Sequence, residues 1–206
     1  MSLTNLSWVP AAAFGDPRSP ELAAVIAVPQ VGGAPPHVAA ALAWKAYAWY
    51  LVNPVVTALA SSAPVPQLDL RNVEVRVTDA VPYVAFRAVD PRPLADDGVV
   101  DLVHETLFEG HLRPVAQALS AATRIGVRTL WGSVAEAVSY PLVSSGRTDL
   151  ADRLLAAWGL DHLLQPALDG GQPFRRTCCL AVTVEGLGVC ATCPVRRARP
   201  VSEGAA

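Results

Sequence analysis

The sequence predicts an α+β fold, in which a mainly helical body carries a small antiparallel sheet and a C-terminal cysteine-rich hairpin. Three observations support this prediction. Apolar residues recur at three- and four-residue steps through much of the second half of the chain, which is the spacing of amphipathic helices. Between residues 70 and 89 they alternate with polar residues, as in a strand with one buried face. All four cysteines lie within residues 178–193.

Composition and charge describe a globular protein of one domain. The chain has 206 residues, of which 52% are hydrophobic and 17% charged, and its net charge is −2. These values exclude a disordered chain, and they predict no nucleic-acid partner. We expect a body over residues 1–170, followed by a metal-binding segment over residues 171–200. The first ten residues, MSLTNLSWVP, lack the charged start and apolar run of a secretory signal, so we expect a cytoplasmic, reducing location.

Six prolines interrupt residues 1–36, so only short elements are expected there. Residues 37–60 then form an apolar stretch about as long as a membrane span. Lys45, near its centre, opposes insertion, because a charge at that depth costs roughly 2.5–3.5 kcal/mol. We therefore expect a buried core helix kinked at Pro54, with peripheral contact with the cytoplasmic membrane face as the alternative.

A β-hairpin is predicted next. Its first strand is VEVRV, residues 73–77, in which valines alternate with charged residues. The turn is expected at Thr78 to Val81. The second strand shows a similar alternation at Tyr83, Ala85 and Arg87.

The first of three predicted helices begins at about Val99, and Pro114 is expected to split or restart it. His104 and His111 lie seven residues apart in this helix, so they share one face but are separated by about 10 Å along the axis. We therefore expect exposed or hydrogen-bonded histidines, not two ligands of one ion.

Two further helices are predicted over residues 127–140 and 148–158. We predict Thr148 as the N-cap of the last helix and Gly159 as the residue that ends it. Tryptophans and tyrosines within residues 44–50 and 131–140 occur at helical spacing, which is more typical of a core than of a substrate wall. The sequence therefore assigns no residue to substrate binding, and none to acid or base catalysis.

The cysteines form the pattern CC-x10-C-x2-C, at Cys178, Cys179, Cys190 and Cys193. The period-two spacing of residues 180–184 and the turn-like sequence EGLG predict a short hairpin, which would bring both cysteine pairs to one end. In a reducing compartment such a group is more typical of metal ligands or redox groups than of disulfides.

Three chemistries are open to these thiols. We favour a two-iron, two-sulfur (2Fe-2S) cluster, because each of its metals takes two thiolates and a local turn can then accommodate adjacent cysteines. A single zinc ion needs four ligands converging on one point, whereas adjacent residues of an extended chain point to opposite faces. A dithiol–disulfide pair at Cys190 and Cys193 is the third alternative, although such motifs usually sit at a helix N-terminus.

Five arginines flank the cysteines, against the single acidic residue Glu185: Arg175, Arg176, Arg196, Arg197 and Arg199. A four-thiolate two-iron cluster is anionic and gains a further negative charge on reduction, so nearby cations raise its reduction potential. Arg175 and Arg176, which directly precede the first cysteines, are best placed for this electrostatic role. A solvated basic tail is the alternative for the other three. The same patch could dock an acidic electron donor.

The stretch RRTCCLAVTVEGLGVCATCP, residues 175–194, resembles the C-terminal 2Fe-2S domain of the FhuF-like ferric-siderophore reductases. It repeats that family's adjacent cysteines, ten-residue gap and C-x-x-C-P ending, preceded by arginines. HLRPVAQAL and TLWGSVAEA, residues 111–119 and 129–137, are similar to helical segments of the family. Ser133 stands where relatives often have asparagine, which makes a polar role there doubtful.

The resemblance implies one-electron reduction of siderophore-bound Fe(III) to Fe(II), commonly from ferric hydroxamates, with the four cysteines as cluster ligands. Hydroxamate oxygens are hard ligands and match the softer ferrous ion poorly. Residues 31–33, VGG, run into two prolines and cannot open a phosphate-binding helix, so the electron is expected from a separate ferredoxin or flavoprotein reductase. The alternative is a non-catalytic binding or sensing protein, in which an iron–sulfur or zinc site only staples the C-terminal segment to the body.

Overall fold

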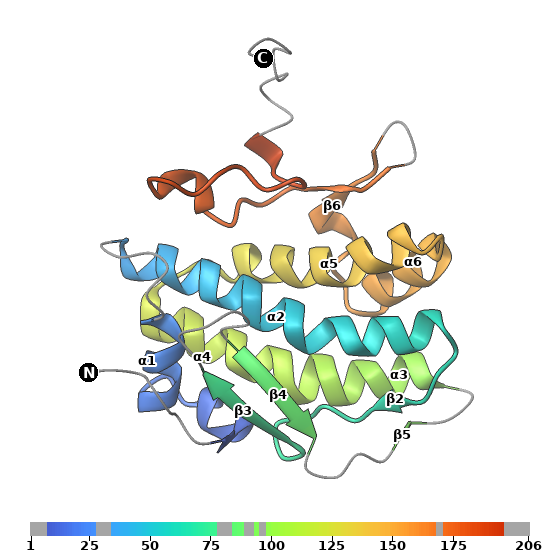
Figure 1. Ribbon diagram of the computed structural model, residues 1–206, viewed down its shortest axis with the longest axis horizontal. Helices are drawn as coiled ribbons and strands as arrows, with labels where there is room; N and C mark the ends of the chain where they lie inside the picture. Colours follow the sequence, from blue (N-terminus) through green and yellow to red (C-terminus); the bar gives the residue numbers. More distant parts are fainter. Residues whose placement is uncertain are drawn as a thin grey trace.

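The computed structural model describes residues 8–27, 34–77, 84–88, 93–94, 98–167 and 171–195 (Figure 1). Its centre is a layer of two long helices, α2 (Pro36–Ala60) and α5 (Val127–Ser144), which pack along each other. A hairpin of β3 (Val73–Val77) and β4 (Val84–Ala88) lies toward one side of this layer, and the C-terminal segment, orange to red, lies on the opposite side. The structure is therefore mainly helical with small antiparallel sheets, as predicted.

The helix expected over residues 37–60 is α2, and it lies in the core. Trp44 and Tyr47 are each 1% exposed, and their rings stack with centroids 5.7 Å apart. The Trp44 indole also donates a hydrogen bond to the carbonyl of Leu130 in α5, at 2.9 Å. The helix continues through Pro54, and the kink expected there stays a prediction. No helix in the described part of the chain is both long and apolar enough to cross a membrane.

The predicted β-hairpin is confirmed. Strand β1 (Val9–Pro10) adds to it, so that the antiparallel sheet has the order β1-β3-β4. The valines of β3 are buried and Arg76 is exposed, which is the expected alternation. The turn predicted at Thr78 to Val81, and Tyr83, lie outside the described residues.

Only short elements precede α2 in the described residues, as the prolines predicted. Besides β1, they are a 3₁₀-helix, η1 (Ala11–Gly15), and α1 (Pro20–Ile26), whose first turn is capped by the Ser19 hydroxyl. After α2, β2 (Val65–Pro66) pairs antiparallel with β5 (Pro93–Leu94).

The first predicted helix of the second half consists of three consecutive pieces: α3 (Val99–Val103), a π-helix η3 (His104–Leu112) and α4 (Arg113–Thr123). Pro114 has no N–H for the carbonyl of Gly110, four residues earlier. The break predicted at Pro114 is instead a change from π-helix to α-helix at Arg113, through which the backbone stays helical. The Gly110 carbonyl instead accepts a hydrogen bond from the Leu70 amide at 3.2 Å. A Cβ on Gly110 would lie 3.2 Å from that of Asp69, so the glycine lets this loop approach the π-helix.

The last predicted helix is α6 (Thr148–Ala157), which packs on α5. The prediction of Thr148 as N-cap is wrong by one residue, because Arg147 occupies the cap position and Thr148 begins the helix. The prediction for Gly159 is confirmed. Its φ of 67° lies in the left-handed region, where a residue without a Cβ ends a helix at least cost.

His111, on the π-helix, is a buried hydrogen-bonded residue and is 0% exposed. Its Nδ1 lies 2.7 Å from the Leu68 carbonyl, which can only accept, so Nδ1 carries the proton. Its Nε2 then accepts from the Tyr47 hydroxyl, at 2.7 Å. His104 is partly exposed and stacks on Phe108. The prediction of exposed or hydrogen-bonded histidines is thus confirmed. The prediction that they share one helix face is wrong, because both lie in a π-helix, whose longer turn does not place residues seven apart on one face.

Replacing His111 by glutamine is expected to reduce the fall of the unfolding free energy as the pH is lowered. Burial lowers the pKa of His111 to about 4, so the stability linked to its neutral form is complete above pH about 6.5 and is lost as the pH falls toward about 4. Each pH unit in this window removes up to about 1.4 kcal/mol of unfolding free energy from the wild type alone. Denaturant titrations across this range measure the difference. His37→Gln, at an exposed histidine, is the control. Parallel pH profiles of wild type and H111Q would contradict the prediction.

Candidate metal centre

The cysteine-bearing segment is closed into a loop and tied to the body. At its start, β6 (Leu164–Gln165) pairs antiparallel with β7 (Phe174–Arg175). The Arg175 amide then donates to the carbonyl of Thr192 at 2.9 Å. This bond joins the residues just before the first cysteine pair to those within the second pair, so both pairs lie at the base of one loop.

The strand predicted over residues 180–184 is wrong. Leu180 has a φ of 66°, in the left-handed region, and Ala181–Thr183 form a 3₁₀-helix, η5. The carbonyls of Leu180 and Ala181 accept the amides three residues on, which closes consecutive turns. Three apolar side chains of the loop are exposed by 38–43%: Val182, Leu187 and Val189. The apolar alternation therefore marks no buried strand face.

The two cysteine pairs meet as the sequence predicted. The sulfur atoms of Cys179 and Cys190 lie 3.9 Å apart, and all four thiols are free. Cys179 and Cys193 are 1% exposed, whereas Cys178 and Cys190 are partly exposed. The Leu180 amide donates to the Cys178 sulfur at 3.3 Å, so the left-handed turn at Leu180 accommodates the adjacent cysteines.

The hydrogen bond between Cys179 and Cys190 has the largest effect on the pKa of both thiols. It lowers the pKa of Cys179 to about 5, and the Ala181 amide and the charges of Arg175 and Lys45 lower it further against the effect of burial. The same hydrogen bond, together with burial, raises the pKa of Cys190 far above its ordinary value. Burial is also the main cause that raises the pKa of Cys178, and Cys193, its neighbour in space, raises this pKa further. The hydrogen bond and the two cations therefore favour negative charge within the Cys179–Cys190 pair.

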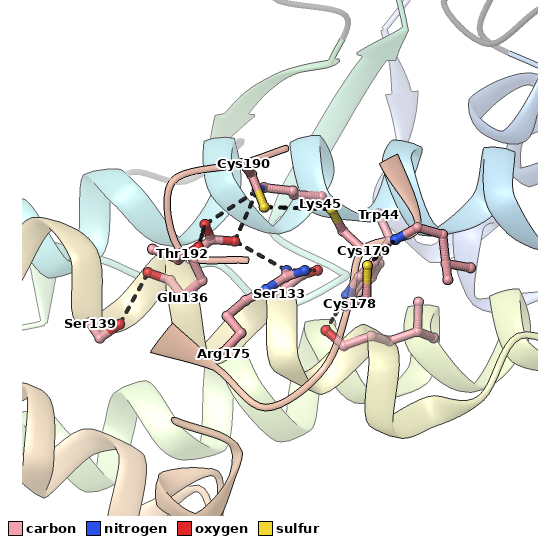
Figure 2. Close-up of polar contacts among 12 residues, drawn as sticks. Trp44, Lys45, Ser133, Glu136, Ser139, Arg175, Cys178, Cys179, Cys190 and Thr192 are labelled. Carbon is pink, nitrogen blue, oxygen red and sulfur yellow. Dashed lines mark hydrogen bonds and ion pairs between the residues drawn. The ribbon is translucent and has the colours of Figure 1, made fainter. Parts of the chain in front are cut away.

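Glu136, on α5, holds a buried ionic network beneath the loop (Figure 2). Its carboxylate lies 3.1 Å from Lys45 Nζ, on α2, and 3.1 Å from Arg175 Nη1. The Thr192 hydroxyl donates to the same carboxylate at 2.5 Å. Arg175 Nη1 also donates to the Ser133 hydroxyl at 3.0 Å. The Glu136 carboxylate thus binds side chains from α2, from the start of the cysteine loop and from its end.

Gly132 lets the loop lie directly on α5. A Cβ at this position would stand 1.8 Å from the Oγ1 of Thr177, the residue before the first cysteine. Gly132, Ser133 and Glu136 therefore form the stretch of α5 that receives the loop: the glycine admits the backbone and the two polar residues bind Arg175.

Buried donors remain beside the cysteines. Arg175 Nε and Nη2 and the Thr177 hydroxyl are buried with no hydrogen-bond partner among the described residues. Buried polar groups are normally paired, so these atoms leave capacity for an acceptor. Within the described ranges, no group of three or more His, Cys, Asp or Glu side chains is arranged around one metal position. The thiols are arranged two by two, Cys179 with Cys190 and Cys178 beside Cys193.

The predicted arginines have different surroundings. Arg175 is 1% exposed and lies in the Glu136 network. Arg176 is exposed, and its Nε donates to the Leu164 carbonyl at 3.1 Å, so its electrostatic role stays a prediction. The three arginines after residue 195 lie outside the described residues. The doubt about Ser133 was wrong, because its hydroxyl accepts the hydrogen bond from Arg175.

Sequence reasoning did not assign Lys45, Glu136 or Thr192 to the site. A weak signal was available for two of them, since Lys45 and Glu136 are charged residues within apolar helical stretches, where an isolated charge is costly. Nothing in the sequence indicated that the two would pair across 91 residues.

A separate surface cavity of about 870 Å³ lies beside the π-helix. It is lined by polar side chains such as Gln67, Asp69 and Glu105. None of its lining residues comes from the cysteine loop, so it is not part of the thiol site.

Gly132→Ala is expected to loosen the loop from α5. Alanine in place of a helix-interior glycine normally stabilises by about 1 kcal/mol, but the clash with Thr177 should reverse the sign, since overpacking costs about 1–3 kcal/mol. Hydrogen–deuterium exchange of residues 171–195 should become faster, and adding Thr177→Ala should restore much of the protection. Gly126→Ala is the control, because a Cβ there meets nothing within 4 Å. Unchanged exchange in G132A would refute this account of the packing.

Comparison with known proteins places the chain in a family. The family model described as "Ferric iron reductase FhuF-like transporter" matches residues 44–186. The matched range begins at Trp44 in α2, contains all of α5 together with Cys178 and Cys179, and ends before Cys190 and Cys193. No curated protein matches the chain. Because the family model covers most of the sequence and the whole surface that receives the cysteine loop, the protein belongs to the FhuF-like ferric iron reductase family.

Proposed function

We propose that this protein is a ferric-siderophore reductase that transfers one electron to siderophore-bound Fe(III) and so releases Fe(II). The observation that supports this best is the gathering of four free thiols beside two buried or partly buried cations, Arg175 and Lys45, in a chain of a ferric iron reductase family. In this proposal residues 1–170 form the body and residues 171–200 the segment that holds the redox group.

The cysteines are proposed to hold a 2Fe-2S cluster. The two-by-two arrangement of the thiols suits a group with two metals better than a single ion. The buried donors of Arg175 and Thr177 suit an anionic group with sulfur acceptors, since such a group could take the hydrogen bonds that they lack. When bound, the cluster would supply a one-electron carrier.

The chain's own residues prepare this site for negative charge. Arg175 and Lys45 stabilise thiolate at Cys179, and their charges act through a largely buried, weakly screened environment. Glu136 and Ser133 hold the Arg175 guanidinium in place. Burial of Cys179 and Cys193 keeps water from two of the four sulfurs.

The substrate class proposed is a ferric hydroxamate. Hydroxamate oxygens are hard ligands that bind Fe(III) tightly, and one added electron gives the softer Fe(II), which they hold poorly. No acid or base is needed for the electron transfer itself. The electron is proposed to come from a ferredoxin or a flavoprotein reductase, and the reaction to take place in the cytoplasm with peripheral membrane contact left open.

Ferric hydroxamate is expected to reoxidise the reduced protein. Anaerobically purified protein should contain about two irons and two sulfides per chain and give a one-electron paramagnetic state with dithionite. Mixing the reduced protein with a ferric trihydroxamate should bleach that state and release Fe(II), trapped by a ferrous chelator. The gallium complex of the same hydroxamate, which has the same shape and charge but accepts no electron, is the control. If no ferric hydroxamate reoxidises the protein, the proposed activity is wrong.

Cys179→Ser is expected to remove the iron and leave the body folded. The loop is already attached by the β6–β7 pair and the Glu136 network, neither of which requires a metal. Val182→Ser, which places serine at an exposed position of the same loop, is the control. Metal analysis and the unfolding transition of the body are measured together. Loss of the body's fold in C179S alone would favour the alternative, a metal-stapled binding or sensing protein.

A further inference from the structure

Two cations and one carboxylate surround the cysteine group from different elements. Lys45 comes from α2, Glu136 from α5 and Arg175 from the start of the loop. Arg175 is fixed by its burial and by bonds to Glu136 and Ser133, whereas the Lys45 side chain is 27% exposed and bonds to Glu136 alone among the described contacts. Lys45 is therefore the member whose charge can be removed with least disturbance of packing.

The network lies against the residues that carry the sulfurs. Thr192, whose hydroxyl donates to Glu136, stands between Cys190 and Cys193. Arg175, which lies 3.1 Å from Glu136, precedes the first cysteine pair and donates its amide to the Thr192 carbonyl. Figure 2 shows Lys45 in the same group of residues as Cys190 and Thr192. Glu136 carries the opposite charge within 3.2 Å of both cations and offsets part of their effect.

We propose that Lys45 and Glu136 set the reduction potential of the group held by the four cysteines, Lys45 raising it and Glu136 lowering it. Reduction moves one electron from the external donor to this group and so adds one negative charge near both side chains. A positive charge at Lys45 stabilises the added electron, and a negative charge at Glu136 destabilises it. The inference rests on the proposed iron–sulfur assignment but not on the identity of the substrate.

Shifts of the reduction potential in opposite directions distinguish an electrostatic role of Lys45 and Glu136 from a purely structural one. Lys45→Met keeps most of the side-chain stem and removes the charge, and Lys45→Arg restores the charge. Glu136→Gln keeps an oxygen acceptor for Arg175 and Thr192 and removes the negative charge. Loosening of the network would move both potentials in the same direction, because the same contacts are weakened in both variants. If the charges themselves act, the reduction potentials of Lys45→Met and Glu136→Gln should shift in opposite directions.

The experiment is a redox titration of the iron-loaded full chain, followed by visible absorbance, without any siderophore. We expect a lower potential in Lys45→Met, a higher one in Glu136→Gln, and values near wild type in Lys45→Arg. Arg153→Met, which removes an exposed cation from α6, is the matched control for net charge and should not shift. Iron content and the apoprotein unfolding midpoint are measured for each variant.

Shifts of the same sign in K45M and E136Q, or no shift in K45M, would overturn the inference. If E136Q does not retain iron, the comparison of K45M with K45R and R153M decides alone: a K45M value equal to theirs overturns the inference. Opposite shifts without reduction of any ferric hydroxamate would support the inference and refute the proposed substrate. Reduction of a ferric hydroxamate by variants whose potentials are unshifted would support the proposed substrate and refute the inference. Wild-type protein that binds no iron would overturn both.

Discussion

The Glu136 carboxylate lies beneath the cysteine loop, where donors from three separate parts of the chain reach it: Lys45, Arg175 and Thr192. A buried charge is costly unless it is paired, and truncating one partner of a buried pair typically costs about 3–5 kcal/mol. The pairing therefore requires α2, α5 and the loop to be in place at the same time. The position of the thiols relative to the body depends on this requirement.

The two central helices supply what the network needs. Helix α2 is buried on several faces, so it can present Lys45 to one side of the layer while Tyr47 binds His111 in the core. Helix α5 presents a short polar stretch next to Gly132, where the absence of a side chain admits the loop backbone. Gly132 leaves room for the loop backbone, and the neighbouring Ser133 and Glu136 bind Arg175 of the loop. Together these residues explain why the loop lies on this part of α5.

The electrostatics of the site follow from the same contacts. Two cations, Lys45 and Arg175, stabilise negative charge on the sulfurs of Cys179 and Cys190. Buried donors on Arg175 and Thr177 that have no partner among the described residues remain for an anionic acceptor. Such an arrangement favours the uptake of an electron, because cations and hydrogen-bond donors that are already in place compensate the added charge with little rearrangement of the protein.

Local patterns in the sequence determined the helices, the β3–β4 hairpin and the meeting of the two cysteine pairs, because spacing along the chain is enough to define a helical face, a strand or a local ligand group. The conformation of residues 180–184 could not be read in this way, since apolar alternation marks a strand only when another segment covers it, and here the loop turns at Leu180 and leaves apolar side chains exposed. The roles of Lys45, Ser133 and Glu136 were decided only by the tertiary structure. Glu136 meets Lys45 across 91 residues, and Ser133 and Glu136 meet Arg175 across 42 and 39 residues. The partner of a charged residue in an apolar helix is decided only when another part of the chain packs against it.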